Sequence, residues 1–272
     1  MLVLLAAVAT GAMAQTTYKV SVKEGTEDAT SWTIAPAEAT TTGVAAGTTV
    51  TATYSGTKKV KSVKAVKKAA GTPLDNTTTA WTAGTFAVPA GGLTYSDAIT
   101  VSGDVTLVLT DGETLTLNKG ISLASGATLT IQGNGTMAVN GTSGSTASTV
   151  AGSGTIILTS GTLTAKGGNG AGFSGSGMNQ TGASGGVAIN GAVTVNGGTL
   201  TATGGNGGSI TGSKNNGCIG GAGGAAISGD LTVNGGTMTT KNGNNGSVAS
   251  INLKCTAGDG GKAVAGTVTD NR

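Results

Sequence analysis

The sequence lacks the side chains on which most enzymes depend. It has no histidine and one arginine, Arg272, and only 10% of its 272 residues are charged, against about 25% in a typical domain. Nucleophilic triads most often take histidine as their base, and glycosidases need two carboxylates beside the scissile bond. No Asp or Glu lies between Thr114 and Gly229. We therefore expect no enzyme activity, no metal and no cofactor. The densest acidic group is interpreted as turn formers beside glycine: Asp97, Asp104, Asp111 and Glu113.

Neither sign of charge is in large excess, since the formal net charge is only +3. Six lysines lie in one run, from Lys58 to Lys68, and no aromatic residue stands among them. Nucleic-acid-binding surfaces combine basic and aromatic residues, whereas an isolated charge run usually marks a solvated face. We expect no nucleic-acid partner.

Long hydrophobic runs are missing after the N-terminus. An apolar run from Leu2 to Ala9 precedes Ala12-Met13-Ala14-Gln15, the small-x-small pattern of a signal-peptidase site. Residues 1–14 are therefore predicted to be a signal peptide, and the protein to be secreted or displayed at the cell surface. The alternative is a buried first strand. The run is too short to span a bilayer, and we expect no transmembrane segment.

Two regions follow. Residues 15–70 contain alternating segments at Tyr18–Lys23 and Thr48–Tyr54, which predict a small, immunoglobulin-like β module. Residues 71–80 are interpreted as a linker. From Trp81, short apolar strands alternate with glycine turns. The regular spacing of these turns predicts stacked coils of parallel strands over residues 81–272.

The strongest signal is a repeat of 37–38 residues that begins near residue 150. Leu163, Leu200 and Met238 occupy equivalent positions, 37 and 38 residues apart. In each copy apolar residues alternate with threonine, so the apolar side chains are expected to face inward. Two strands joined by Asn196-Gly197-Gly198, a third near Val187–Ile189 and a Gly/Asn/Ser surface loop would complete one coil. A fourth copy begins at Gly266 and stops mid-repeat, so we expect a truncated array.

The two cysteines test this register. Cys218 and Cys255 are 37 residues apart, which is one period. Equivalent positions in adjacent coils lie about 4.8 Å apart, within the Cα separation of about 4.4–6.8 Å that a disulfide requires. In an exported protein the pair is predicted to be bridged. Two free thiols are the alternative, because both lie in the loop part of the period.

Residues 81–131 and 185–208, the latter GGVAINGAVTVNGGTLTATGGNGG, are similar to secreted surface proteins of gut anaerobic bacteria. That family is described as adhesin-like or carbohydrate-binding, and it has a right-handed parallel β-helix. Residues 47–68 resemble the immunoglobulin-like modules that precede the β-helix. The resemblance implies an all-β fold and a glycan or cell-surface polymer as partner.

Candidate ligand-binding residues are few. Outward Thr-x-Thr rows would display hydroxyls to a glycan, or order water as in ice-binding proteins. Sugars also stack on aromatic rings, and the aromatic candidates are Trp32, Trp81, Tyr95 and Phe173. Phe173 is the only aromatic residue in the repeat loops, whereas Trp81 and Tyr95 are expected to cap the first coil. The predicted row residues are Thr162, Thr164, Thr199, Thr201, Thr237 and Thr239.

The sequence thus favours a non-catalytic exported β-solenoid that serves as a scaffold for adhesion or glycan contact. One alternative is a carbohydrate-binding module of a larger polysaccharide-processing protein. Ice binding and a polysaccharide lyase-like function rank third.

Overall fold

The chain forms two compact units, residues Met1–Ala70 and Gly71–Arg272. The computed structural model describes residues 71–272, except 176–178, 213–216, 250–254 and 261. In the first unit it describes seven strands: β1 (Leu2–Leu5), β2 (Thr17–Glu24), β3 (Glu27–Asp28), β4 (Trp32–Ala35), β5 (Val44–Ala45), β6 (Thr49–Tyr54) and β7 (Ser62–Lys68).

The described strands of the first unit pair in antiparallel sheets. One has the strand order β1-β6-β4; in the other, β2 pairs with β3, β5 and β7. The pairing of β2 with β7 extends from Thr17–Lys68 to Lys23–Ser62. The predicted signal peptide overlaps β1, and its cleavage position at Ala14 lies outside the described residues. Export and the immunoglobulin-like character of this unit both stay predictions.

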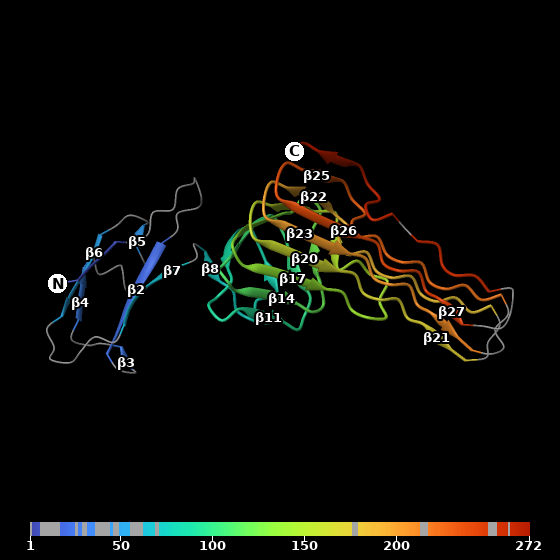
Figure 1. Ribbon diagram of the computed structural model, residues 1–272, viewed down its shortest axis with the longest axis horizontal. Helices are drawn as coiled ribbons and strands as arrows, with labels where there is room; N and C mark the ends of the chain where they lie inside the picture. The colour runs from blue at the N-terminus through green and yellow to red at the C-terminus, as the bar shows by residue number, and fades with distance from the viewer. Residues whose placement is uncertain are drawn as a thin grey trace. The chain divides into compact units, whose positions relative to one another are not determined.

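The second unit is a parallel β-helix, as the repeat predicts. Figure 1 shows its strands stacked one above another in successive coils. Three parallel stacks form its sides. The eight-stranded sheet contains β8 (Thr72–Pro73), β10 (Gly84–Ala87), β13 (Asp104–Leu109), β16 (Thr128–Gly133), β19 (Thr155–Leu158), β22 (Ala192–Val195), β25 (Leu231–Val233) and β28 (Val268–Asp270).

The other two sides are shorter. The six-stranded sheet contains β11 (Leu93–Tyr95), β14 (Thr114–Leu117), β17 (Thr136–Asn140), β20 (Thr162–Lys166), β23 (Thr199–Thr203) and β26 (Thr237–Lys241). The four-stranded sheet contains β9 (Ala80–Trp81), β12 (Ile99–Val101), β15 (Ile121–Leu123) and β18 (Val150–Gly152). Beyond β18 this side continues only as single bridges through Ile189, Ile227 and Val264. The third strand predicted at residues 187–189 is therefore one bridge.

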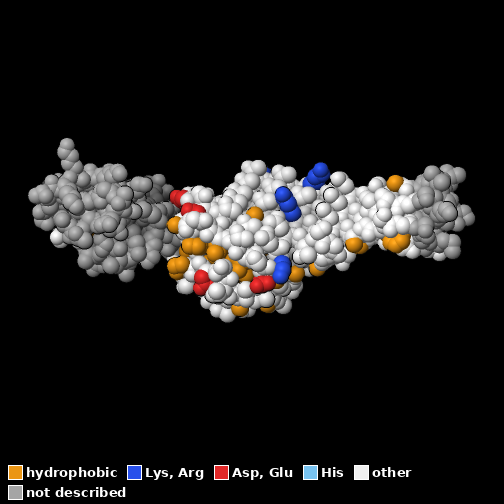
Figure 2. Space-filling model, turned by 90° about the horizontal axis from the view of Figure 1, so that it is seen from below, with side chains coloured by type: hydrophobic (Ala, Val, Ile, Leu, Met, Phe, Trp, Pro, Cys, Tyr) orange, Lys and Arg blue, Asp and Glu red, His pale blue; other side chains and the backbone are white. Residues whose placement is uncertain are grey.

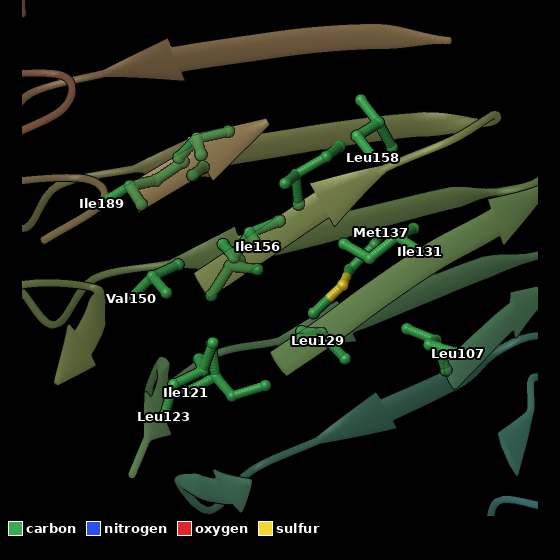
Figure 3. Packing of buried hydrophobic residues seen from close by; sticks show 14 of the residues in the cluster. Leu107, Ile121, Leu123, Leu129, Ile131, Met137, Val150, Ile156, Leu158 and Ile189 are labelled. Carbon is green, nitrogen blue, oxygen red and sulfur yellow. The ribbon is translucent and has the colours of Figure 1, made fainter. Parts of the chain in front are cut away.

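The core is a column of aliphatic side chains inside the coils. Because strand side chains alternate between faces, the Thr-Leu-Thr pattern sends each leucine inward, and Leu163 and Leu200 are fully buried. Side chains from different sheets meet in the centre, as Leu129, Ile121 and Met137 do in Figure 3. Each such side chain contributes about 1.5–3 kcal/mol by leaving water. The stack is thereby stabilised layer by layer.

Coil length rises along the chain. Paired positions are 22 residues apart from Leu93 to Leu115 and again from Leu115 to Met137. The step is 26 residues from Met137 to Leu163, and 37 and 38 residues over the next two steps, through Leu200 to Met238. The longer coils add a glycine-rich excursion between the six-stranded sheet and the Ile189–Ile227–Val264 side.

This excursion, predicted to be a surface loop, is an ordered layer. We call it the glycine extension: the described residues of 167–187, 204–225 and 242–263. It projects to one side of the coils in Figure 1 and includes a three-stranded sheet of β21 (Phe173–Ser174), β24 (Ile210–Thr211) and β27 (Val248–Ala249). Single bridges join Thr181, Ile219 and Thr256 on the returning segments.

Backbone hydrogen bonds link the segments of the glycine extension in two directions. Gly167 and Gly170 donate to Thr203 and Asn206 of the next coil. Across the extension, Gly186 N donates to Gly168 O (2.8 Å), and Gly205 N donates to Gly186 O (2.9 Å). The spacing of three residues matches the three residues per turn of a polyproline II helix, whose close packing requires glycine at the crowded positions. Glycine here permits backbone contact in place of a hydrophobic core.

The segment 71–80 is not a linker, which corrects the prediction from sequence. Thr72 and Pro73 pair with Phe86 and Ala87 of β10, and Ala80 pairs with Thr100 of β12. The Leu74 side chain is only 4% exposed. The polar residues of the segment 71–80 form turns within the first coil.

Polar and aromatic contacts fix this first coil. Asp75 Oδ1 accepts hydrogen bonds from Thr77 N (2.9 Å), Thr77 Oγ1 (2.8 Å) and Thr78 N (2.8 Å). The Tyr95 hydroxyl donates to Asp75 O, and Trp81 Nε1 donates to Thr78 O (3.3 Å). The Trp81 and Tyr95 rings lie edge to face at 6.1 Å. These contacts close the start of the β-helix.

The Thr77 hydrogen bonds are expected to be measurable through the pKa of Asp75. Together with smaller contributions from Thr78, they hold that pKa at about 2, below the usual 3.8. Thr77→Val removes the side-chain donor, the largest cause, so the Asp75 pKa should rise toward 3.8 in a carboxyl NMR titration. Asp270, whose pKa is also about 2 but depends on Arg272, is the internal control. An Asp75 pKa that stays at about 2 in the variant would contradict this assignment.

The lowered pKa of Asp75 makes the free energy of unfolding depend on pH. A carboxylate with a depressed folded-state pKa stabilises the fold above its unfolded-state pKa. The Asp75 contribution is therefore complete above about pH 3.8 and is lost as the pH falls through about 2.

Candidate ligand-binding face

The predicted threonine rows come together on the outer face of the six-stranded sheet. Thr162 pairs with Thr199 and Thr199 with Thr237, while Thr164, Thr201 and Thr239 form a second row in the same register. Rows in adjacent coils repeat at about 4.8 Å, and residues two apart along a strand lie about 7 Å from each other. We call this the threonine face: Thr162, Thr164, Thr199, Thr201, Thr237 and Thr239.

The rows extend beyond the repeats that predicted them. Thr114 and Thr136 continue the first row, and Thr94 and Thr116 continue the second, which Ala138 interrupts. A third row runs beside them through Asn140, Lys166, Thr203 and Lys241. The outer face is therefore a grid of small hydroxyl-bearing residues with two lysines along one side.

The hydroxyls of the threonine face are open to a ligand. None of the six forms a hydrogen bond with another described residue, and all six residues are half-exposed or exposed. By contrast, threonines in the bends are engaged: Thr159 Oγ1 donates to Ile131 O (2.9 Å), and Thr149 Oγ1 donates to Lys166 O (2.7 Å). Hydroxyls on the face can thus donate to, and accept from, water or a bound polymer.

A further row on the eight-stranded sheet was missed from the sequence. It runs through Thr85, Thr106, Thr130, Ile157, Thr194, Thr232 and Thr269 in parallel register. Every strand of the row except β19, which has Ile157, contributes one central outward threonine, and only β16, with Thr128-Leu129-Thr130, contains a Thr-x-Thr motif. The signal available was the recurrence of Val-Thr-Val and Leu-Thr-Val in successive repeats.

Phe173 does not join the threonine face. It lies on β21 in the glycine extension and pairs with Ile210, which pairs in turn with Val248. Residues paired in parallel register point to the same side, and Ile210 is fully buried, so Phe173 points into the extension and is half-buried there. Trp81 and Tyr95 are buried in the first coil. Of Trp32 only the backbone, in β4, is described.

The two cysteines are bonded within the glycine extension. Cys218 and Cys255 form a disulfide between the returning segments of adjacent coils, and their Cα atoms are 4.5 Å apart. Cys218 N also donates to Cys255 Sγ (3.4 Å). The disulfide therefore lies away from the threonine face and joins two coils at the same register.

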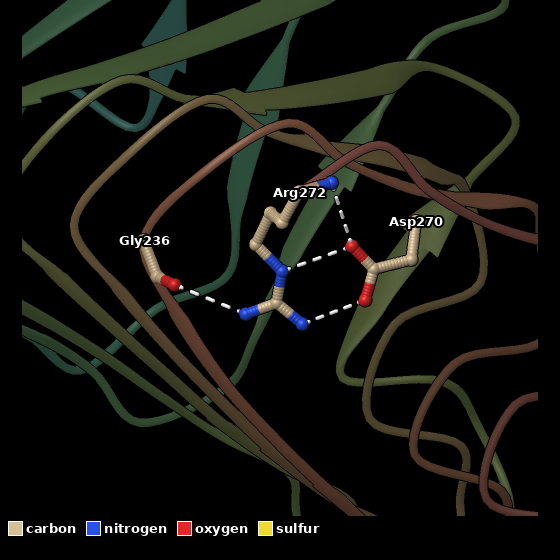
Figure 4. A network of polar contacts seen from close by, with 3 residues as sticks. All are labelled: Gly236, Asp270 and Arg272. Atoms are coloured by element: carbon tan, nitrogen blue, oxygen red, sulfur yellow. Dashed lines mark hydrogen bonds and ion pairs between the residues drawn. The ribbon is translucent and has the colours of Figure 1, made fainter.

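Ion pairs among the described residues lie at bends and at the chain end. Lys119 pairs with Asp97 at 3.2 Å. The Arg272 guanidinium bonds to both oxygens of Asp270 and to Gly236 O (3.2 Å), as Figure 4 shows. These hydrogen bonds hold the pKa of Asp270 at about 2. The Arg272 guanidinium is thus already bound to Asp270 and Gly236 of the same chain.

The described residues were also compared with the requirements of a metal site and of a membrane-spanning helix. No group of three or more His, Cys, Asp or Glu side chains among them is placed to hold a metal ion. Within the same described ranges, no helix has the length and apolar character needed to cross a membrane.

Comparison of the chain with family models, with curated proteins and with solved structures finds no match.

Proposed function

We propose that this protein is an exported, non-catalytic surface protein whose β-helix displays a glycan-contacting or adhesive face. The threonine face carries the proposal, because its hydroxyls are in register and have no partner among the described residues. Sugars present hydroxyls in a similarly regular array along a polymer. A rigid grid binds such a polymer without first having to order flexible side chains.

Export is supported by two independent features. The N-terminal pattern up to Ala14 is typical of a signal peptide, and the Cys218–Cys255 disulfide is a kind of bond that persists in oxidising compartments. A rigid scaffold outside the cell can present a binding face to host or microbial polymers.

Ice binding is the other function that threonine rows serve, and the geometry favours it less. Lys166 and Lys241 are exposed on the same face. Long lysine side chains beside the rows would hold a flat crystal surface away from the hydroxyls. A flexible polymer can instead lie between them.

The test is a glycan-array screen combined with a cell-adhesion assay on the disulfide-bonded protein. We expect Thr199→Val with Thr201→Val to weaken binding about tenfold or more, because each lost hydrogen bond contributes about 0.5–1.5 kcal/mol. Valine keeps the shape and the strand preference of threonine. Thr194→Val with Thr232→Val, on the eight-stranded sheet, is the matched control.

Two results would contradict the proposal. One is the absence of both glycan binding and adhesion in the native protein. The other is equal binding by the threonine-face variant and the native protein. Thermal hysteresis lost in the threonine-face variant would instead assign ice binding to the same residues.

A further inference from the structure

Charge is distributed unevenly over the surface of the β-helix. No Asp or Glu lies between Thr114 and Gly229, a stretch that supplies β14, β17, β20 and β23 of the six-stranded sheet. The adjoining strands β11 (LTY) and β26 (TMTTK) also contain no acid. Figure 2 shows how few charged side chains, basic or acidic, the described surface carries on the side in view.

The only charged residues in the strands of the six-stranded sheet are Lys166 and Lys241. Both stand in the row beside the threonine face, separated by Thr203. Two coil steps of about 4.8 Å place them about 10 Å apart along the coil axis. Both side chains are exposed, and neither forms an ion pair with a described residue.

The eight-stranded sheet provides a contrast within the same β-helix. It also has a threonine row, but its strands carry Asp104 and Asp270 and no lysine. Asp270 is paired with Arg272, whereas the carboxylate of Asp104 is exposed at the start of β13. A polyanion would therefore be favoured on the six-stranded sheet and disfavoured on the eight-stranded one.

We propose that the threonine face binds an acidic polysaccharide that lies along the coil axis, with its carboxylates at Lys166 and Lys241. This inference rests on the proposed function and names its ligand class. The threonine hydroxyls meet the sugar hydroxyls, while the two ammonium groups meet carboxylates on alternate sugars of an extended chain. The rise of one coil is comparable to the length of one sugar in such a chain.

A polysaccharide fits this face better than a nucleic acid does. Single-stranded nucleic acids bind to grooves where bases stack on aromatic side chains, and duplexes need many phosphate contacts. The outward residues of the six-stranded sheet include no aromatic residue and no arginine. Hydroxyl rows with only two cations match a polymer that is rich in hydroxyls and modestly charged.

The test compares polygalacturonic acid with its fully methyl-esterified form, which has the same backbone without the charge. We expect the native, disulfide-bonded protein to bind the acid more tightly, and Lys166→Gln with Lys241→Gln to weaken that binding several-fold, up to about 25-fold. Each exposed ion pair contributes at most about 1 kcal/mol, or roughly fivefold. Affinity should also fall as salt rises. Lys262→Gln, in the glycine extension, is the matched control. Lys119→Gln, whose ammonium group is already paired with Asp97, is a second control, and both variants should bind as the native protein does.

The outcomes separate this inference from the proposed function. Equal binding of the acid and the ester, or binding unchanged by the double lysine variant, would overturn the acidic class and leave glycan contact standing. Equally tight binding of poly-glutamate would overturn the polysaccharide assignment. Failure to bind any glycan on the array would overturn both.

Discussion

Replacing Gly205 with alanine is expected to unfold the glycine extension while the three-sided coil stays folded. A Cβ atom at this position would lie 1.9 Å from Gly168 O and 2.5 Å from Gly168 C. Both obstructing atoms are backbone, so no rotamer change relieves the clash. Forcing an extra carbon into a packed interior typically costs 1–3 kcal/mol, and we expect about 3 kcal/mol here.

The effect should be local because each coil contacts mainly its neighbours. Hydrogen exchange followed by mass spectrometry should show fast exchange at residues 167–187 and 204–225 in the Gly205→Ala variant. Peptides covering β13, β14 and β16 should stay protected. Gly260→Ala is the matched control, because the nearest atoms to its Cβ would be the side-chain amides of Asn245 and Asn242, at 3.1 Å and beyond. Slow hydrogen exchange throughout the Gly205→Ala variant would show that the extension tolerates a Cβ atom at this position, and would contradict the prediction.

The sequence predicts the coils because their physics is periodic. Leucine and threonine alternate at Thr162–Thr164 and again at Thr199–Thr201, and a shift of one residue would place Leu163 and Leu200 in water. The 37-residue spacing then fixes which strands pair. The threonine face was predictable for the same reason, since outward rows follow once inward residues are stacked.

The glycine extension was not predictable from the same signals. It has no hydrophobic alternation, because its segments pack through backbone hydrogen bonds such as Gly205 N to Gly186 O. A glycine-rich, polar stretch normally indicates a loop. The feature that distinguishes it is the recurrence of glycine every third residue, as at Gly167 and Gly170 or Gly204 and Gly207.

The positions of isolated residues were not predictable from the sequence. Leu74 is the one large aliphatic residue between Gly71 and Ala80, and such a single residue does not reveal that residues 71–80 belong to the first coil. The direction of Phe173 depends on β21, a strand of two residues, which is too short for alternation to predict a face. The lysine row depends on Lys166 and Lys241 being placed two coils apart, which only the register establishes.

Removing the disulfide is expected to cost about 3–4 kcal/mol, the value for a bridge between residues 37 apart in the chain-entropy model. The bridge joins the returning segments of two coils, whose Cα atoms are already 4.5 Å apart at equivalent positions. The native backbone therefore needs no bridge to bring them together. The loss should arise from the greater freedom of the opened chain.

The measurement is thermal unfolding of the Cys218→Ala, Cys255→Ala double variant beside the oxidised and the reduced native protein. Because each coil depends on its neighbours, we expect the variant to lose the cooperativity between the last two coils first. Exchange should rise at residues 217–225 and 255–260, while the threonine face keeps its glycan affinity. Equal unfolding of all three samples would contradict a stabilising bridge. Loss of affinity in the variant would instead show that the extension supports the face, and that the two act as one unit.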